Sequence, residues 1–137
     1  MDIYELVNKY VEVGYSEEDA IPKVAQDIVL LKIGKSKYSK NITVKGGVVM
    51  HNISKDMRRA TRDMDIDFIK YSLEDKSIRN FIKELNNTDD GIKIKIAGKL
   101  SLFSPNEFSN VSISCIAFSY SPILIYAFAL LCNVIIN

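Results

Sequence analysis

The chain has 137 residues, with 18 Lys or Arg, 17 Asp or Glu and a formal net charge of +1. This length allows one domain with a modest core, and the balanced charge gives no support for a protein that coats nucleic acid generally. Two cysteines, Cys115 and Cys132, lack a metal-ligand spacing and are too few for a disulfide framework. The N-terminal stretch has early acidic residues and no continuous apolar core, so it is not a signal peptide and we expect a cytoplasmic protein.

The first part of the chain predicts a helix followed by a strand. Ser16, with an acidic residue three positions later, is typical of a helix N-cap, and apolar residues then recur at helical spacing to about Ile33. The β-branched segment 42–45 predicts a strand that ends in a tight turn at the paired glycines 46–47. Residues 48–54 are expected to form one or two helical turns.

The middle of the chain predicts a strand, a helix and another strand. Residues 63–69 alternate polar and apolar side chains, and Ser72 marks a second N-cap. Behind this cap an apolar stripe runs at helical spacing from Ile78 to Leu85. Residues 92–97 alternate apolar and basic side chains, which is typical of a half-buried strand whose lysines face outward at a sheet edge. This order of elements predicts an α+β (α/β) fold, with a small mixed sheet and flanking helices.

Three aspartates, Asp63, Asp65 and Asp67, occupy alternate positions of the predicted strand 63–69. Successive strand side chains point to opposite faces, so the three carboxylates share one face, and the apolar residues that alternate with them can pack against a core. Three like charges at this spacing repel one another, so a positive partner is expected on the carboxylate face. Asp67 is expected either to support the other two carboxylates or to be exposed to solvent.

Paired glycines after one strand and an Asp-x-Asp strand downstream are what phosphoryl chemistry with a divalent metal requires. Gly46 and Gly47 let the backbone approach a triphosphate closely, with N–H groups facing its oxygens. Asp63 and Asp65 are suited to ligate Mg²⁺, a hard cation that takes carboxylates and substrate phosphates together. Arginines within residues 58–62 would balance the charge of a nucleotide.

These residues resemble the DNA polymerase β-type nucleotidyltransferase superfamily, in which a Gly-Gly or Gly-Ser turn is followed by Asp-x-Asp. More narrowly, the segments VKGGVVMHNI and RRATRDMDIDFI are similar to the AbiEii/AbiGii nucleotidyltransferase toxin family of bacterial toxin–antitoxin systems. In that family a KGG turn precedes an R-x-[ST]-x-D-x-D strand. The matching residues are Lys45, Gly46, Gly47, Arg59, Thr61, Asp63 and Asp65.

The resemblance extends at least from about Glu17 to Leu100 and implies a nucleotidyltransferase-like core. It implies that Asp63 and Asp65 are catalytic and hold Mg²⁺, and that the other matching residues bind the nucleotide. The implied reaction transfers a nucleotidyl group from an NTP to an RNA or protein acceptor. By the same resemblance the protein would be the toxin of an abortive-infection system, with a separately encoded antitoxin as its partner.

The sequence departs from the family in its third carboxylate and in its C-terminal part. The superfamily usually adds a carboxylate on a later strand, where this chain has lysines, and family members are commonly about twice as long. Residues 1–100 hold 34 of the 35 charged side chains, whereas residues 101–137 hold only Glu107. We therefore expect 1–100 to be a partial nucleotidyltransferase-like core and 101–137 to be a hydrophobic tail that is out of frame or foreign to the domain. Deleting such a tail would leave a chain that still folds.

Two alternatives stay open at this point. One is a truncated, inactive derivative that acts at most as a nucleotide-binding or interaction fragment. The other is a small membrane-anchored protein, because the chain from Phe108 to Asn137 carries no charge. Ser, Asn and Pro122 interrupt this run and no basic residue follows it, so a membrane span is the less favoured interpretation.

Overall fold

The computed structural model describes residues 2–45, 63–69, 74–96, 100–103, 110–120 and 123–135. The helices within these ranges are α1 (Ile3–Glu12), α2 (Glu17–Lys35) and α4 (Asp75–Leu85). The strands are β1 (Ile42–Lys45), β2 (Asp63–Ile69), β3 (Lys93–Ile96), β4 (Leu100–Phe103), β5 (Asn110–Tyr120) and β6 (Ile123–Ile135). The α+β class with a mixed sheet and flanking helices, predicted from the sequence, is confirmed.

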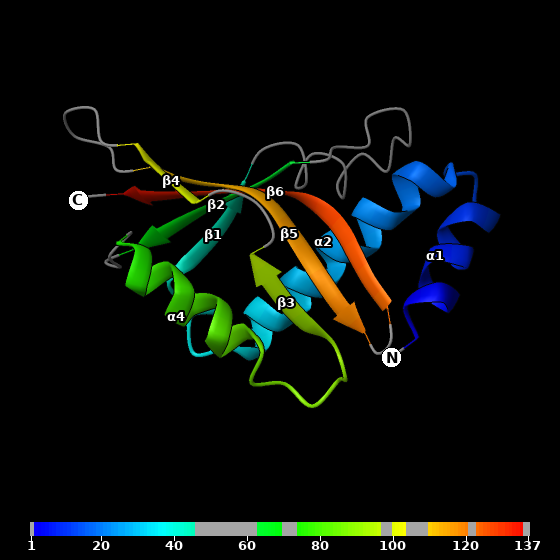
Figure 1. The fold of residues 1–137 in the computed structure, drawn as a ribbon, viewed down its shortest axis with the longest axis horizontal. Coiled ribbons are helices and arrows are strands. Elements are labelled where there is room, and N and C mark those ends of the chain that lie inside the picture. Colours follow the sequence, from blue (N-terminus) through cyan, green and yellow to red (C-terminus); the bar gives the residue numbers. More distant parts are fainter. Residues whose placement is uncertain are drawn as a thin grey trace.

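All the described strands belong to one sheet, whose order is β1-β2-β6-β5-β3 (Figure 1). Only the β2–β6 pair is parallel among the pairings described, and β1–β2, β5–β6, β3–β5 and β4–β5 are antiparallel. β3 and β4 pair with successive parts of β5, since Lys93 lies opposite Ser119 and Leu100 lies opposite Ile113. β6 therefore lies inside the sheet, between the aspartate-bearing strand β2 and strand β5.

Helices α1 and α2 begin where a side chain caps their free N–H groups. The Ser16 hydroxyl accepts a hydrogen bond from the Asp19 backbone N–H at 3.2 Å, which confirms the predicted start of α2. Asp2 caps α1 in the same way, through the Tyr4 N–H at 2.9 Å. Gly14, with a φ of 113°, lets the chain turn from α1 into α2, a conformation that side chains with a Cβ rarely adopt. Helix α1 was not predicted from the sequence.

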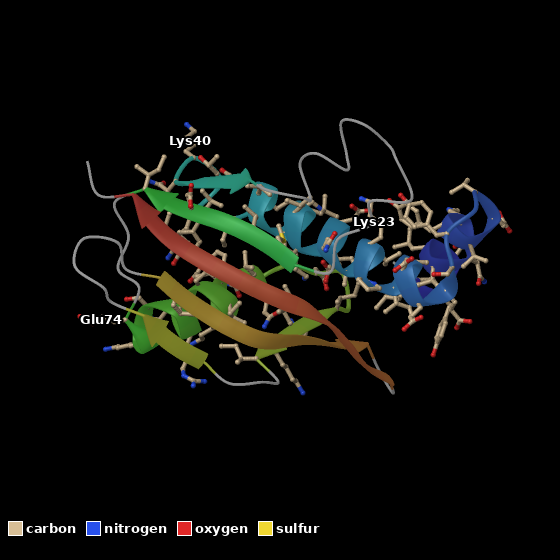
Figure 2. All side chains as sticks on the ribbon, turned by 90° about the horizontal axis from the view of Figure 1, so that it is seen from above. Lys23, Lys40 and Glu74 are labelled. Atoms are coloured by element: carbon tan, nitrogen blue, oxygen red, sulfur yellow. The ribbon has the colours of Figure 1, made fainter. Side chains whose placement is uncertain are left out.

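The core lies between one face of the sheet and the helices α2 and α4 (Figure 2). The three apolar residues that each follow an aspartate of β2 are 0% exposed, as the alternation predicts: Met64, Ile66 and Phe68. The predicted stripe of α4 is buried as well: Ile78, Phe81, Ile82 and Leu85. Phe68 and Phe81 meet edge to face with ring centroids 4.8 Å apart, which joins β2 to α4.

A polar cluster attaches α1 to α2. The Tyr10 hydroxyl donates a hydrogen bond to the Asp27 carboxylate, and Lys23 Nζ lies 2.6 Å from the other carboxylate oxygen of Asp27. Partial burial raises the pKa of Tyr10, and the hydrogen bond to Asp27 raises it further. The Lys23 ammonium also lies 5.5 Å from the centre of the Tyr10 ring. The short helix α1 is thus held by a specific contact as well as by its apolar side.

The structure bears only in part on several other predictions from the sequence. α4 begins at Asp75 with Glu74 as its N-cap, two residues after the predicted cap Ser72, which lies outside the described residues. The predicted helical turns over 48–54 also lie outside them. The segment expected to be a tail contributes the paired strands β5 and β6, and its foreign or out-of-frame origin stays a prediction. In the part of the chain that is described, no helix is both long enough and apolar enough to cross a membrane.

Candidate functional site

The pairing of β1 with β2 brings the two halves of the predicted motif together. Lys45 lies directly opposite Asp65, and Thr43 lies directly opposite Asp67. Residues opposite each other in an antiparallel ladder share a face of the sheet, so Lys45 and Asp65 lie on the same face. Gly46 and Gly47 follow Lys45 directly in the sequence and lie outside the described residues.

The aspartates lie on the face of the sheet that the helices α2 and α4 do not cover. The intervening residues of β2 point into the helix-covered core, and strand side chains alternate between faces. Asp63 and Asp65 are two residues apart on this extended strand, which places their Cα atoms about 7 Å apart. This spacing lets two carboxylates converge on one ion or on two neighbouring ions.

Asp67 is buried, at 5% exposure, so the expectation that it is simply exposed is wrong. On the strands to either side, Thr43 of β1 and Asn133 of β6 lie opposite Asp67. Asn133 in turn lies opposite Asn110 of β5, which continues a polar row across four strands. A supporting role of Asp67 toward the other two carboxylates stays a prediction.

The remaining predicted site residues are only partly covered by the structure. Lys45, Asp63 and Asp65 are placed by their backbone, through β1 and β2. Gly46, Gly47, Arg59 and Thr61 lie outside the described residues. The structure therefore bears on the site through the register of β1 and β2, in which Lys45 lies opposite Asp65.

The donor atoms of Asp63 and Asp65 fit Mg²⁺, because Mg²⁺ prefers carboxylate oxygens together with phosphate oxygens. The neighbouring strand adds no third carboxylate at this level, since Ala129 lies opposite Asp63 and Leu131 opposite Asp65 on β6. Among the described side chains no group of three or more His, Cys, Asp or Glu is arranged to hold a metal.

A second polar cluster, which sequence reasoning missed, is built around Lys32 of α2. This lysine is 0% exposed, and its ammonium lies 2.9 and 2.8 Å from the two carboxylate oxygens of Asp90 and also donates to the Thr88 hydroxyl. Burial alone would raise the pKa of Asp90, but the Lys32 hydrogen bond, the Ile92 N–H and the Thr88 hydroxyl together lower it below its ordinary value. The cluster anchors the turn before β3 to α2. The sequence did carry one signal for this cluster. Lys32 is four residues, or about one helical turn, after Ile28, so it lies on the apolar side of α2.

Comparison of the chain with protein-family models, curated proteins and solved structures finds no match. The likeness to nucleotidyltransferases consequently rests on the motif residues themselves.

Proposed function

We propose that this protein is a Mg²⁺-dependent nucleotidyltransferase that acts in the cytoplasm as the toxin of a bacterial toxin–antitoxin system. The observation that supports the proposal best is the register of β1 and β2, which puts Lys45 opposite Asp65. Lys45 directly precedes the paired glycines in the sequence and is separated from Asp63 by the 17 residues 46–62, yet it pairs with the Asp-x-Asp strand. Such closeness is what a site for a metal-bound triphosphate requires.

Each motif residue has a distinct part in the proposed site. Asp63 and Asp65 would hold Mg²⁺, which supplies positive charge to the phosphate oxygens when bound. Gly46 and Gly47 let backbone N–H groups approach the triphosphate, and Lys45 and Arg59 offset its negative charge. Thr61 would donate a hydroxyl hydrogen bond to the nucleotide. An acceptor hydroxyl would then form the new bond to the α-phosphorus and lose its proton to solvent, while the bond to pyrophosphate breaks.

A second candidate function is nucleotide binding without transfer. It is favoured by the register of β6, which puts the apolar residues Ala129 and Leu131, and so no further carboxylate, beside Asp63 and Asp65 on that strand. Two carboxylates and a triphosphate suffice to hold a metal, whereas transfer also requires an activated acceptor. In that case the chain would bind NTP, an antitoxin or both, but would modify no RNA or protein.

Isothermal titration calorimetry with each NTP, in the presence and absence of Mg²⁺, tests the shared premise of both functions. We expect Asp63→Asn and Asp65→Asn each to abolish Mg²⁺-dependent NTP binding while the circular dichroism spectrum stays unchanged. Removing mutual repulsion does not destabilise the strand, whereas losing a carboxylate removes a metal ligand.

The matched control is Asp89→Asn, which makes the same chemical change at an exposed aspartate in the turn before β3. This variant is expected to bind NTP like the wild type. Unchanged affinity in both Asp63→Asn and Asp65→Asn would reject the metal assignment. Binding without incorporation of labelled nucleotide into RNA or protein would support the second candidate function instead of the first.

A further inference from the structure

Strands β6, β5 and β4 extend the face of the sheet that carries the aspartates (Figure 1). Residues that pair across neighbouring strands share a face of the sheet. The row that contains Asp67 continues to Asn133 of β6, to Asn110 of β5 and then to Phe103 of β4. This face therefore runs without a break from the candidate metal site into the uncharged part of the chain.

The register separates polar from apolar residues on these strands. The neighbouring row on the same face contains Asp65 and continues to Leu131, Ser112 and Ser101. Four of the six positions that the two rows add beyond β2 are therefore asparagine or serine. The row between them belongs to the core-facing side and is apolar: Ile66, Cys132, Val111 and Leu102. The strand alternation thus places these asparagines and serines on the aspartate face of the sheet.

The residue types in these added rows are uncharged. Amides and hydroxyls both donate and accept hydrogen bonds, which suits the hydroxyls of a sugar and the edge of a base. Phe103, at the end of its row, adds an aromatic ring of the kind on which bases stack. Because neighbouring strands are about 4.8 Å apart, β5 and β4 lie roughly 10 and 14 Å from β2. The sugar and base of a nucleotide cover a span of this order when its phosphates are held at Asp63 and Asp65.

We propose that the nucleoside part of the nucleotide substrate binds across β6, β5 and β4. The place of its phosphates rests on the proposed function, whereas the uncharged polar rows follow from the strand register alone. The sugar would lie over β6, and the base over β5 and β4, where the row holds Asn110 and Phe103. Asp67, which is 5% exposed, belongs to the same row and is not counted as a contact. The C-terminal strands then contribute to substrate binding.

Adenosine tests this surface by itself, because a nucleoside without phosphates needs no metal. In the full-length protein without Mg²⁺, excess adenosine should shift the amide NMR signals of Asn110, Ser112 and Phe103 and leave that of the exposed Asn87 unchanged. No shift at these three residues, or an equal shift at Asn87, would overturn the proposal. Asp63→Asn should show the same adenosine shifts while it loses Mg²⁺-dependent NTP binding, so failure of the metal site and failure of this surface give different results.

Calorimetry with ATP and with inorganic tripolyphosphate, both with Mg²⁺, separates the nucleoside from the phosphates. We expect Asn110→Ala to weaken ATP binding about tenfold, the effect of losing one good base contact, and to leave tripolyphosphate binding unchanged, which also shows that the variant is folded. The matched control Asn87→Ala should bind both ligands like the wild type. Equal affinity of the wild type for the two ligands, or unchanged ATP affinity of Asn110→Ala, would contradict the proposal. If the wild type binds neither ligand, the metal site fails, and the adenosine shifts alone decide on this surface.

Discussion

Replacing Asp90 tests how the buried cluster around Lys32 stabilises the fold. Asp90→Ala leaves the Lys32 ammonium, which is 0% exposed, without the carboxylate that lies 2.8 Å away, and it also removes the acceptor of the Ile92 N–H. Removing one partner of a buried ion pair costs about 3–5 kcal/mol, because the remaining charge stays desolvated and uncompensated. A domain of this size is usually stable by about 5–15 kcal/mol, so the variant should be severely destabilised. Urea denaturation at pH 7 measures the difference.

The neighbouring exposed residue supplies the control, since Asp89→Ala should change the free energy of unfolding by no more than about 0.5 kcal/mol. The double variant Lys32→Met/Asp90→Ala should be more stable than Asp90→Ala alone, because it no longer buries a lone charge. If Asp90→Ala is as stable as Asp89→Ala, Lys32 is not held as described and the argument fails.

The same pair makes stability depend on pH in a defined direction. The folded-state pKa of Asp90 lies below its ordinary value of 3.8, so the unfolded chain takes up the proton first as the pH falls. The stabilisation by the pair is therefore complete above about pH 5 and is lost as the pH falls through the folded-state pKa. The difference in unfolding free energy between the wild type and Asp90→Ala should shrink between about pH 5 and pH 3. A difference that grows as the pH is lowered would contradict the assignment.

Three further changes follow from the sheet, the turn and the helix contact. Deleting residues 101–137 unpairs the seven residues of β2 from β6 and removes four apolar positions on the core-facing side (Val111, Ile113, Leu130 and Val134). Because β2 would then keep only β1 as a strand neighbour, we expect no cooperative melting by circular dichroism, and a retained transition would support the foreign-tail prediction. Gly47→Val should weaken Mg²⁺-dependent NTP binding by about 1–3 kcal/mol in calorimetry, since a Cβ would strain the turn and crowd the phosphate; Gly34→Val, where an added Cβ meets no atom within 4 Å, should bind normally. Tyr10→Phe should lose about 1.5 kcal/mol of stability in thermal melts through its hydrogen bond to Asp27, and the half-exposed Tyr4→Phe should lose nothing measurable.

The sequence alone predicted the buried sides of β2 and α4, because the pattern of apolar residues lies within each element. The alternation in β2 gave its buried side, and the spacing from Ile78 to Leu85 gave the buried side of α4. Helix α1 was missed because it has only ten residues, of which two are buried, Ile3 and Val7. Its place depends on the contact between Tyr10 and Asp27, which are 17 residues apart in sequence.

Other features of the fold depend on contacts between residues far apart in the sequence, which local patterns do not reveal. An uncharged apolar run suits a tail, a membrane segment or an interior strand equally well, and only the register of β6 against β2 distinguishes the last. The burial of Asp67 likewise could not be read from strand 63–69, whose alternation is the same for an exposed and a covered carboxylate face. Lys32 and Asp90 are 58 residues apart, so their ion pair was also invisible to spacing rules. For the candidate site, the residues stay a prediction from the motif, and the strands β1 and β2 place the backbone of three of them: Lys45, Asp63 and Asp65.

The central proposal is that Asp63 and Asp65 hold a divalent metal beside the Gly-Gly turn, and paramagnetic broadening by Mn²⁺ tests it most directly. Mn²⁺ accepts the same carboxylate and phosphate ligands as Mg²⁺ and broadens the amide NMR signals of nearby residues. In the presence of each NTP, substoichiometric Mn²⁺ should broaden the signals of Lys45, Asp63 and Asp65 first and leave that of Lys83, at the far end of the sheet order, sharp. Signals of Asp63 and Asp65 that broaden no more than that of the exposed Asp89 would contradict the proposal.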